Sequence, residues 1–324
     1  MNRFKIFLGF IFLALISCTE EEITKTDSIT DPDTDLEVPT DPDIDSEIPF
    51  EYKFEKESFT HALTNTAVPY HLFEPKNAEG SNTKFPLIIA LHGAEYFLTP
   101  EDDFLNIDYT GYMALAWIEK ENQEKYPAYV VAPHLHEALW ENNEDYFGWS
   151  NTASSDFVEK LLDHLIKTEN IDTNRVYITG HSMGGDGTWY LGAKLQDRIA
   201  AIVPLSNAVS ESTMSFVKSK IENGTFENFP IWNFIHRNDG GAVYSQELFT
   251  TFEANGHDNV YTHKVGGVDY DLTTEEILAE INDGKLRFHT EYSYSCDLAY
   301  CHFAMGKALR EPFLFEWLFK QKRK

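Results

Sequence analysis

A serine lies between glycines at positions 180–184, in the sequence G-H-S-M-G. The stretch Arg175–Gly180 that leads into it is typical of a strand, and the stretch that follows is typical of a helix. A turn this tight between strand and helix holds its serine in strained backbone, with the hydroxyl at the carboxyl edge of a sheet. The pattern therefore predicts Ser182 as a nucleophile. The alternative is a glycine-rich turn in which the serine caps a helix.

A serine that attacks a carbonyl group needs N–H donors for the negative oxygen that develops. The backbone N–H of Met183, directly after the serine, is one candidate. The second belongs in a loop after an earlier strand, and Phe85–Gly93 is an apolar run that ends in such a loop. We expect Ala94 to supply this second N–H, with Gly93 as the less favoured choice. His92 is expected to shape the loop by hydrogen bonding rather than to act in catalysis.

The acid of a serine triad on such a turn follows the serine in chain order, and it belongs on a loop after a late strand. Asp239 comes shortly after the apolar stretch Phe229–His236 and before two glycines. Its role would be to hold the tautomer of an imidazole and to stabilise the imidazolium ion. Asp258, Asp269 and Asp271 are rivals that follow no equally clear strand.

The base must follow the acid, and four histidines satisfy that order. His257 lies in a polar turn, and His263 lies inside an expected strand. His302 lies on an expected irregular stretch before the last helix, from which an imidazole can reach over the edge of a sheet. We expect His302 to be the base, and His289 remains the main alternative.

Two cysteines, Cys296 and Cys301, lie just before the expected base. They are expected to form a disulfide that holds this loop, with reduced thiols as the alternative. Metal-ligand spacing is weak throughout, because the nearest match is the single H-x-H of His134 and His136. We therefore expect no metal and no organic cofactor.

Strands and helices alternate along the chain, which favours a three-layer α/β sandwich with a mostly parallel central sheet. Seven segments are expected as strands: Val68–Pro75, Phe85–Gly93, Ala128–Pro133, Arg175–Gly180, Ala200–Ser206, Phe229–His236 and Val260–Val265. Besides the helix after the serine, three segments are expected as helices: Ser154–Asn170 with a serine cap, Val243–Gly256 and Glu311–Arg323.

The composition excludes several classes of protein. At 42% hydrophobic residues the chain of 324 residues is too apolar to be wholly disordered. Its net charge of −27 disfavours a nucleic-acid partner, which requires a basic face. Three cysteines are too few for a disulfide scaffold.

The N-terminus has the pattern of a targeting segment. A short basic start precedes the apolar run Ile6–Ile16, which is too short to span a bilayer and is typical of a signal peptide. Its end, Leu15–Cys18, resembles the processing site of bacterial lipoproteins. We expect residues 1–17 to be a signal peptide and Cys18 to carry lipid, so that this anchor is the protein's only membrane attachment; an incidental cysteine is the alternative.

Residues 18–50 are rich in Asp, Glu, Thr, Ser and Pro, and they carry twelve acidic residues against one lysine. Such a segment buries too little apolar surface to fold, so we expect a disordered tether. Its acidic start, Glu20–Glu22, resembles a surface-export tag, which predicts attachment at the bacterial outer membrane or cell surface. Residues 51–324 form the expected catalytic domain.

The stretch from 172 to 206, D-T-N-R-V-Y-I-T-G-H-S-M-G-G-D-G-T-W and onward, resembles secreted α/β-hydrolase esterases of the predicted peptidase or phospholipase/carboxylesterase type. These are neighbours of polyhydroxybutyrate depolymerases and of feruloyl and acetylxylan esterases of the carbohydrate esterase family 1 kind. The likeness extends from about Val68 to Trp317. It implies the α/β-hydrolase fold and a Ser182, Asp239 and His302 triad. It further implies hydrolysis of acetyl or hydroxycinnamoyl esters on polysaccharide, or of small acyl esters.

The chain departs from that family at several positions. Glu95 stands where the family usually has a glycine in the oxyanion loop, and Cys301 stands where a glycine often precedes the base. The segment 266–296 looks like an added segment with a helix at Thr273–Asn282. The aromatic residues of 139–150, with Tyr96 and Phe97, either face a sugar or pack in the core. A peptidase with the same triad and an inactive glycan-binding protein remain alternatives.

Overall fold

The computed structural model describes residues 53–76, 78, 80–94, 111–139, 148–262 and 272–323. The expected signal peptide, Cys18 and the acidic tether lie outside the described residues. So do Glu95, Tyr96, Phe97, His263, Asp269 and Asp271.

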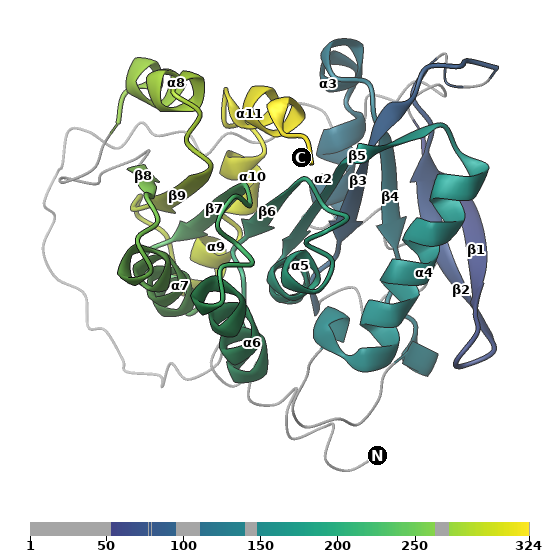
Figure 1. Ribbon diagram of the computed structural model, residues 1–324, viewed down its shortest axis with the longest axis horizontal. Helices are drawn as coiled ribbons and strands as arrows, with labels where there is room; N and C mark the ends of the chain where they lie inside the picture. Colours follow the sequence, from purple (N-terminus) through teal and green to yellow (C-terminus); the bar gives the residue numbers. More distant parts are fainter. Residues whose placement is uncertain are drawn as a thin grey trace, which may run out of the picture. The chain divides into compact units, whose positions relative to one another are not determined.

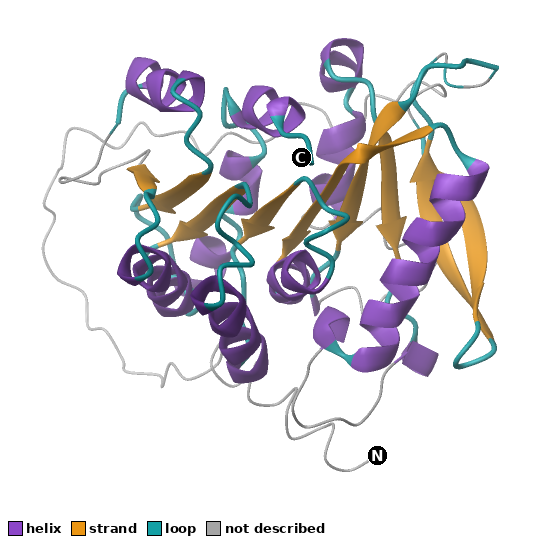
Figure 2. Ribbon diagram, viewed as in Figure 1, coloured by secondary structure: helices purple, strands orange, loops and turns teal. Residues whose placement is uncertain are grey.

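A nine-stranded sheet forms the centre of the domain, with the strand order β1-β2-β4-β3-β5-β6-β7-β9-β8 (Figure 2). The strands are β1 (Glu55–His61), β2 (Thr66–Phe73), β3 (Phe85–Leu91), β4 (Tyr129–Pro133), β5 (Ile171–His181), β6 (Ala201–Leu205), β7 (Ile231–His236), β8 (Val260–Thr262) and β9 (Arg287–Tyr292). Strands β1, β2 and β4 pair antiparallel, and every pair from β4 to β8 is parallel. The expected α/β sandwich with a mostly parallel sheet is confirmed.

The central strands are buried on both faces, which explains their nearly continuous apolar sequences. Along β3, Leu87, Ile89 and Leu91 enter one hydrophobic cluster, while Ile88 and Ala90 enter the other. This alternation follows from the two-residue period of a strand. The sheet therefore separates two layers of helices (Figure 1).

Helices of the first layer pack on the cluster that contains Ile89, and they include the helix after Ser182. They are α4 (Thr152–Thr168), α5 (Met183–Lys194), α6 (Glu211–Glu222) and α7 (Ala242–Ala254). The opposite cluster is covered by α2 (Gly111–Ile118), α8 (Thr274–Asn282), α10 (Met305–Ala308) and α11 (Leu314–Lys320). Shorter elements are α3 (Lys120–Lys125), α9 (Leu298–His302) and the 3-10 turns η3 (Glu137–Leu139) and η4 (Gly148–Ser150).

Most expected elements are present, and all seven expected strands are confirmed within a few residues. Helix α4 begins earlier than expected, and its cap is Asn151, whose side chain accepts a hydrogen bond from the N–H of Ala153. The expected serine cap at Ser154 is therefore wrong: that side chain is fully buried and donates to the carbonyl of Leu139. The final helix is shorter than expected and spans only Leu314–Lys320.

Strands β1 and β9 were not expected from the sequence. The sequence of β9, R-F-H-T-E-Y, is polar, yet all six residues are buried. Neighbouring side chains hydrogen-bond two of its polar residues: the indole of Trp232 donates to Thr290, and the amide of Gln246 donates to Glu291. Because β9 lies between β7 and β8, the segment 266–296 is not simply an added surface loop. It supplies an interior strand of the sheet.

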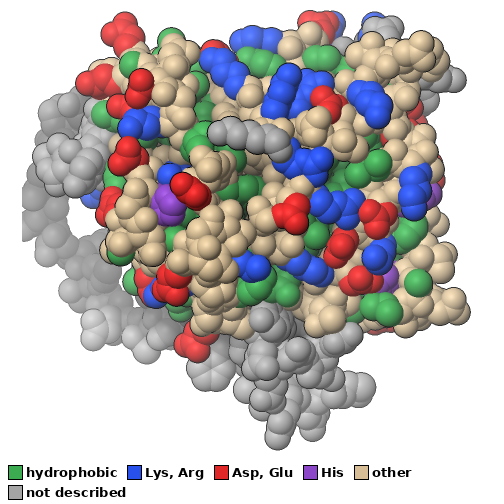
Figure 3. Space-filling model, in the orientation of Figure 1, with side chains coloured by type: hydrophobic (Ala, Val, Ile, Leu, Met, Phe, Trp, Pro, Cys, Tyr) green, Lys and Arg blue, Asp and Glu red, His purple; other side chains and the backbone are tan. Residues whose placement is uncertain are grey.

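Charged side chains of both signs share the face shown in Figure 3, where Lys and Arg gather above helices α3 and α11. Lys84, Lys125, Arg175 and Lys320 line one shallow groove together. Arg175 and Lys320 pair with Asp172 and Glu316. Among the described helices, none has both the length and the apolar character that a bilayer crossing requires.

Candidate active site

Ser182 lies at the end of β5 and directly before α5, as its sequence context predicts. Its backbone has φ +57° and ψ −115°, a region that residues with side chains rarely adopt. Its N–H donates to the carbonyl of Leu205, and its carbonyl accepts from the N–H groups of Asp186 and Ala208. These bonds hold the strained turn in place, which is how such strain persists at functional sites.

The glycine that follows the serine by two residues is required by close backbone contact. A Cβ on Gly184 would lie 2.0 Å from the carbonyl oxygen of Leu91, at the end of β3. A Cβ on Gly180 would lie 2.3 Å from the carbonyl oxygen of Gly184. Any larger residue would push the first turn of α5 away from β3, so the two glycines bring the serine close to the loop after β3.

The structure brings His302 to Ser182 although 120 residues separate them. The Nε2 atom of His302 lies 2.8 Å from the hydroxyl oxygen of Ser182. Its Nδ1 atom lies 2.8 Å from a carboxylate oxygen of Asp239. Because a carboxylate only accepts hydrogen bonds, the proton of the neutral ring is on Nδ1, and Nε2 is free to accept the serine proton.

Asp239 lies three residues after β7 and is almost completely buried, with 3% of its side chain exposed. Its second oxygen accepts the N–H of Gly241 at 2.8 Å, which fixes the carboxylate in the plane that faces His302. The imidazole of His302 is 31% exposed, so one side of the ring stays open to an incoming molecule.

The rival acids and bases that are described lie elsewhere. Asp258 is an exposed partner of Lys285, and His257 packs against Phe252 after α7. His289 is buried in β9, where its Nδ1 accepts from the amide of Asn233. His302 also differs from expectation in one respect: it ends the short helix α9 instead of lying on irregular backbone.

The two expected oxyanion donors lie on adjoining elements. Met183 is the first residue of α5, and N–H groups of a first helical turn have no partner within the helix. Ala94 follows β3 and packs against the same hydrophobic cluster as Met183. The contact between Gly184 and the end of β3 brings these two segments together.

His92 behaves as a shaping residue of the oxyanion loop. Its Nδ1–H donates to the carbonyl of Gly93 at 2.8 Å, and its Nε2 accepts the N–H of Leu135 at 3.0 Å. With both ring nitrogens engaged, the ring is neutral and cannot take a proton from a substrate without breaking a bond. The expectation that His92 acts through the loop rather than in catalysis agrees with these contacts.

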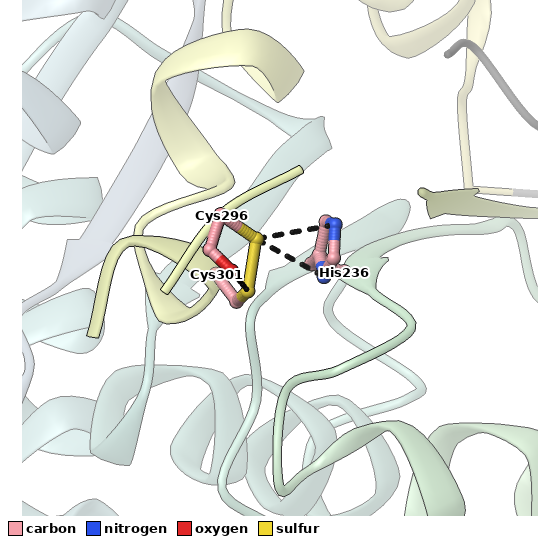
Figure 4. Close-up of side chains that lie close together, drawn as sticks. All are labelled: His236, Cys296 and Cys301. Atoms are coloured by element: carbon pink, nitrogen blue, oxygen red, sulfur yellow. Dashed lines mark hydrogen bonds between the residues drawn. A yellow bond between two sulfur atoms is a disulfide. The ribbon is translucent and has the colours of Figure 1, made fainter. Parts of the chain in front are cut away.

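A disulfide joins Cys296 and Cys301, the residues that lie just before His302 (Figure 4). The Sγ atom of Cys296 lies 3.3 Å from Nε2 of His236, the last residue of β7. The same ring nitrogen donates to the carbonyl of Tyr294 at 2.8 Å. The loop that carries the base is therefore attached to the strand that leads to the acid.

Among the described residues, one group of three potential metal ligands lies close together: His236, Cys296 and Cys301. The sulfur atoms of the two cysteines are joined in the disulfide, and only a free thiolate is an effective metal ligand. The oxidised group does not fit a metal ion. In the weak H-x-H match, Nδ1 of His136 accepts the N–H of Ala138.

Two contributors to the site were missed by the sequence reasoning. His181, which precedes the serine, is buried, and its Nε2–H donates to the backbone carbonyl of His302 at 3.0 Å. Asp186, in the first turn of α5, is fully buried and accepts from the N–H of Ser210 at 2.7 Å and the hydroxyl of Thr213 at 3.1 Å. An acid near a helix start normally indicates an exposed dipole partner, so the sequence carried no signal of this buried role.

Burial raises the pKa of Asp186 to about 6, against hydrogen bonds from Ser210, Ser150 and Thr213 that lower it. Burial also raises the pKa of Tyr294, and the nearby charge of Asp239 adds to this. Both shifts follow from removing an ionisable group from water.

The aromatic stretch before α4 contributes to the core where it is described. Leu139 and Trp149 have no exposed surface, so the packing interpretation applies to them and neither presents a face to a sugar. The residues 140–147 between them lie outside the described residues, as do Tyr96 and Phe97.

No family model matches the chain. A bifunctional acetylxylan esterase/xylanase of Neocallimastix patriciarum is 40% identical over 55 residues, which are 17% of this chain and 8% of that protein. The chain thus spans only a small part of the curated relative that it matches.

Solved structures resemble the domain over most of its length. A thermostable esterase is 25% identical with a TM-score of 0.60, over 83% of this chain and 63% of that one. A feruloyl esterase module from Clostridium thermocellum, complexed with sinapinate, is 14% identical with a TM-score of 0.54, over 82% and 92%. A fluorophosphonate-binding serine hydrolase of Staphylococcus aureus is 13% identical with a TM-score of 0.52, over 83% and 98%. The chain has the α/β-hydrolase fold.

Proposed function

We propose that this chain is a serine hydrolase of carboxylic esters that works through a covalent acyl-enzyme. The observation that carries the proposal is the position of His302, whose two ring nitrogens lie 2.8 Å from Ser182 and 2.8 Å from Asp239. A nucleophile, a base and an acid that orients the base are the groups that acyl transfer requires. The likeness to a thermostable esterase supports the same reaction class.

In the first half-reaction the oxygen of Ser182 bonds to the carbonyl carbon of the ester while Nε2 of His302 takes the serine proton. The N–H groups of Met183 and Ala94 stabilise the negative oxygen of the tetrahedral intermediate. The carbon–oxygen bond to the alcohol then breaks, and the alcohol leaves with the proton from His302.

In the second half-reaction water attacks the acyl-enzyme and gives a proton to His302. The bond to Ser182 breaks, the serine regains its proton, and the carboxylic acid leaves. Throughout, Asp239 stabilises the imidazolium form of His302 and keeps the ring in its productive orientation.

We propose acetyl or hydroxycinnamoyl esters on polysaccharide as the substrate class, with small acyl esters as the alternative. The short match to an acetylxylan esterase/xylanase and the fold shared with a feruloyl esterase module support this choice. A peptidase with the same triad and an inactive glycan-binding protein are the competing interpretations.

The direct test is hydrolysis of p-nitrophenyl acetate by the wild type, by Ser182→Ala and by Ser219→Ala, an exposed serine of α6. Loss of the nucleophile should lower turnover by about 10⁴–10⁶-fold, and the control should keep wild-type turnover. Equal hydrolysis by the wild type and Ser182→Ala would overturn the proposal. Acetylated xylan, feruloylated oligosaccharides and peptides then separate the substrate classes; a wild type that binds glycan but releases no acid is a binding protein.

We also propose that residues 1–17 are a signal peptide and that a lipid on Cys18 anchors the domain at the bacterial outer membrane or cell surface. The basic start, the apolar run and the cysteine after Ser17 support this. Expression of Cys18→Ala should move the protein from the membrane fraction to the soluble fraction. A variant that stays in the membrane fraction would contradict the lipid anchor.

A further inference from the structure

We infer that Trp149 is a positioning residue of the oxyanion hole, acting through a hydrogen bond to the loop that carries Ala94. This inference rests on the proposed ester hydrolysis and adds a residue to its site. Trp149 lies in η4, is fully buried, and its indole Nε1–H donates to the backbone carbonyl of His92 at 2.9 Å. Its ring also meets the imidazole of His92 edge-on, with ring centroids 4.9 Å apart.

The hydrogen bond from Trp149 affects the oxyanion hole because His92 in turn orients the peptide unit between Gly93 and Ala94. The imidazole of His92 donates to the carbonyl oxygen of Gly93 at 2.8 Å. A trans peptide is planar, so the carbonyl of Gly93 and the N–H of Ala94 lie in one plane and point in opposite directions. Holding that oxygen therefore fixes the direction of the proposed oxyanion donor.

Several contacts hold the residue His92 itself. Its carbonyl accepts from Trp149, its Nε2 accepts from the N–H of Leu135, and its ring packs on the indole. The bond from Trp149 reaches the backbone carbonyl of His92 beside the nucleophile helix, where a Cβ on Gly184 would lie 2.8 Å from the same oxygen.

Trp149 is in turn attached to α5. A Cβ on Gly187 would lie 2.3 Å from Cβ of Trp149, so the helix packs directly against the first side-chain atoms of the tryptophan. The neighbour Ser150 hydrogen-bonds the buried carboxyl of Asp186, also on α5. One donor, Met183, begins this helix, and the other, Ala94, is held through Trp149. The tryptophan thus links the two halves of the oxyanion hole.

A misdirected donor weakens the transition state more than the bound substrate, because the oxygen carries full negative charge only in the tetrahedral state. Loss of the indole N–H should therefore lower kcat and leave KM nearly unchanged. Removing an oxyanion donor outright costs about 10²–10³-fold in kcat, so loss of a residue that only orients one should cost about 10–100-fold.

The chain offers a matched control in Trp189 of α5. This tryptophan is also fully buried, and among the described residues its Nε1 has no hydrogen-bond partner. Trp149→Phe and Trp189→Phe remove similar volumes from the core, but only the first removes a bond to the oxyanion loop. Replacement of Trp149 by benzothienylalanine, with sulfur in place of the N–H, keeps the ring shape should the phenylalanine variant fail to fold.

The experiment measures kcat and KM for p-nitrophenyl acetate, and the affinity for a trifluoromethyl ketone that forms a tetrahedral adduct with Ser182. We expect Trp149→Phe and the benzothienylalanine variant to lose kcat and ketone affinity by similar factors at nearly constant KM. Trp189→Phe should lose less than about threefold in kcat or in ketone affinity.

Two results contradict the inference in different ways. If the wild type hydrolyses the ester and the Trp149 variants match Trp189→Phe in kcat and ketone affinity, the positioning role is wrong and the proposed function stands. If the wild type hydrolyses no ester, the proposed function fails, and the role of Trp149 fails with it.

Discussion

Nε2 of His181 lies 3.0 Å from the backbone carbonyl oxygen of His302, so the residue before the proposed nucleophile holds the backbone of the proposed base. The ring of His181 also stacks on Phe303, with centroids 5.5 Å apart. The end of β5 and His302 are therefore linked twice, once through the hydroxyl of Ser182 and once through the ring of His181. The second link depends on the ring proton of His181 alone.

Substitution of His181 by Phe keeps the ring packing and removes the donor. The net value of such a hydrogen bond is about 1 kcal/mol, which lowers the melting temperature by about 2–4 °C in a domain of this size. We expect turnover to fall about 3–10-fold because the base loop is less well ordered. Melting curves and ester hydrolysis check both effects. His181→Gln, which keeps an N–H donor, should recover part of the loss; equal behaviour of the two variants would contradict the role of the bond.

Asp239→Asn tests the acid. The amide of asparagine can donate to Nδ1 of His302 and so favours the tautomer that cannot accept the proton of Ser182. We expect turnover to fall by about 10⁴-fold with little change in melting temperature. Asp258→Asn is the control, because that exposed carboxyl pairs with Lys285 at the surface. A turnover of Asp239→Asn within tenfold of this control would remove Asp239 from the triad.

The disulfide between Cys296 and Cys301 closes a short loop directly before His302. Loss of such a bridge, in a Cys296→Ser, Cys301→Ser double variant, should reduce the free energy of unfolding by about 2 kcal/mol. Turnover should fall with it, since the base is the next residue along the chain. Urea unfolding and ester hydrolysis measure the two effects. Dithiothreitol should reproduce them in the wild type and leave the double variant unchanged.

The buried carboxyl of Asp186 predicts a pH dependence of stability. Its pKa is about 6 in the folded protein and close to 4 when unfolded, so the folded state holds its proton more tightly. The stability that this proton contributes is complete below pH 4 and is lost as the pH rises through 6. The shift corresponds to about 3 kcal/mol, since one pKa unit is about 1.4 kcal/mol.

Urea unfolding of the wild type and of Asp186→Asn at pH 4 and at pH 7 isolates this contribution, because the asparagine cannot ionise. We expect the stability of the wild type, relative to the variant, to decrease between these pH values. An unchanged difference would show that the carboxyl is equally easy to ionise in the folded and unfolded chain.

The sequence alone determined the fold class and the position of the serine, because both are written in local patterns. Apolar runs such as Phe85–Gly93 predict buried strands, and the G-x-S-x-G pattern between a strand and a helix predicts the turn, although the close contact of Gly184 with Leu91 joins segments that are distant along the chain. Because the acid and the base follow the serine along the chain, only a small number of later aspartates and histidines remained as candidates for these two roles. Strand β9 was not predicted, because its sequence is polar and its buried polar residues bond to side chains on distant segments, as Thr290 does to Trp232.

The packing of distant segments selects the histidine that contacts Ser182 and the buried groups that support both residues. His289 and His302 both satisfy the order along the chain, yet one lies inside the sheet and the other reaches Ser182 from the end of α9. The contacts of Trp149, His181 and Asp186 likewise join segments that are distant along the chain or belong to different elements. Hydrophobic periodicity and turn chemistry are visible in a sequence because they act over a few neighbouring residues. Burial and hydrogen bonding between elements depend instead on how the sheet and its two helical layers pack.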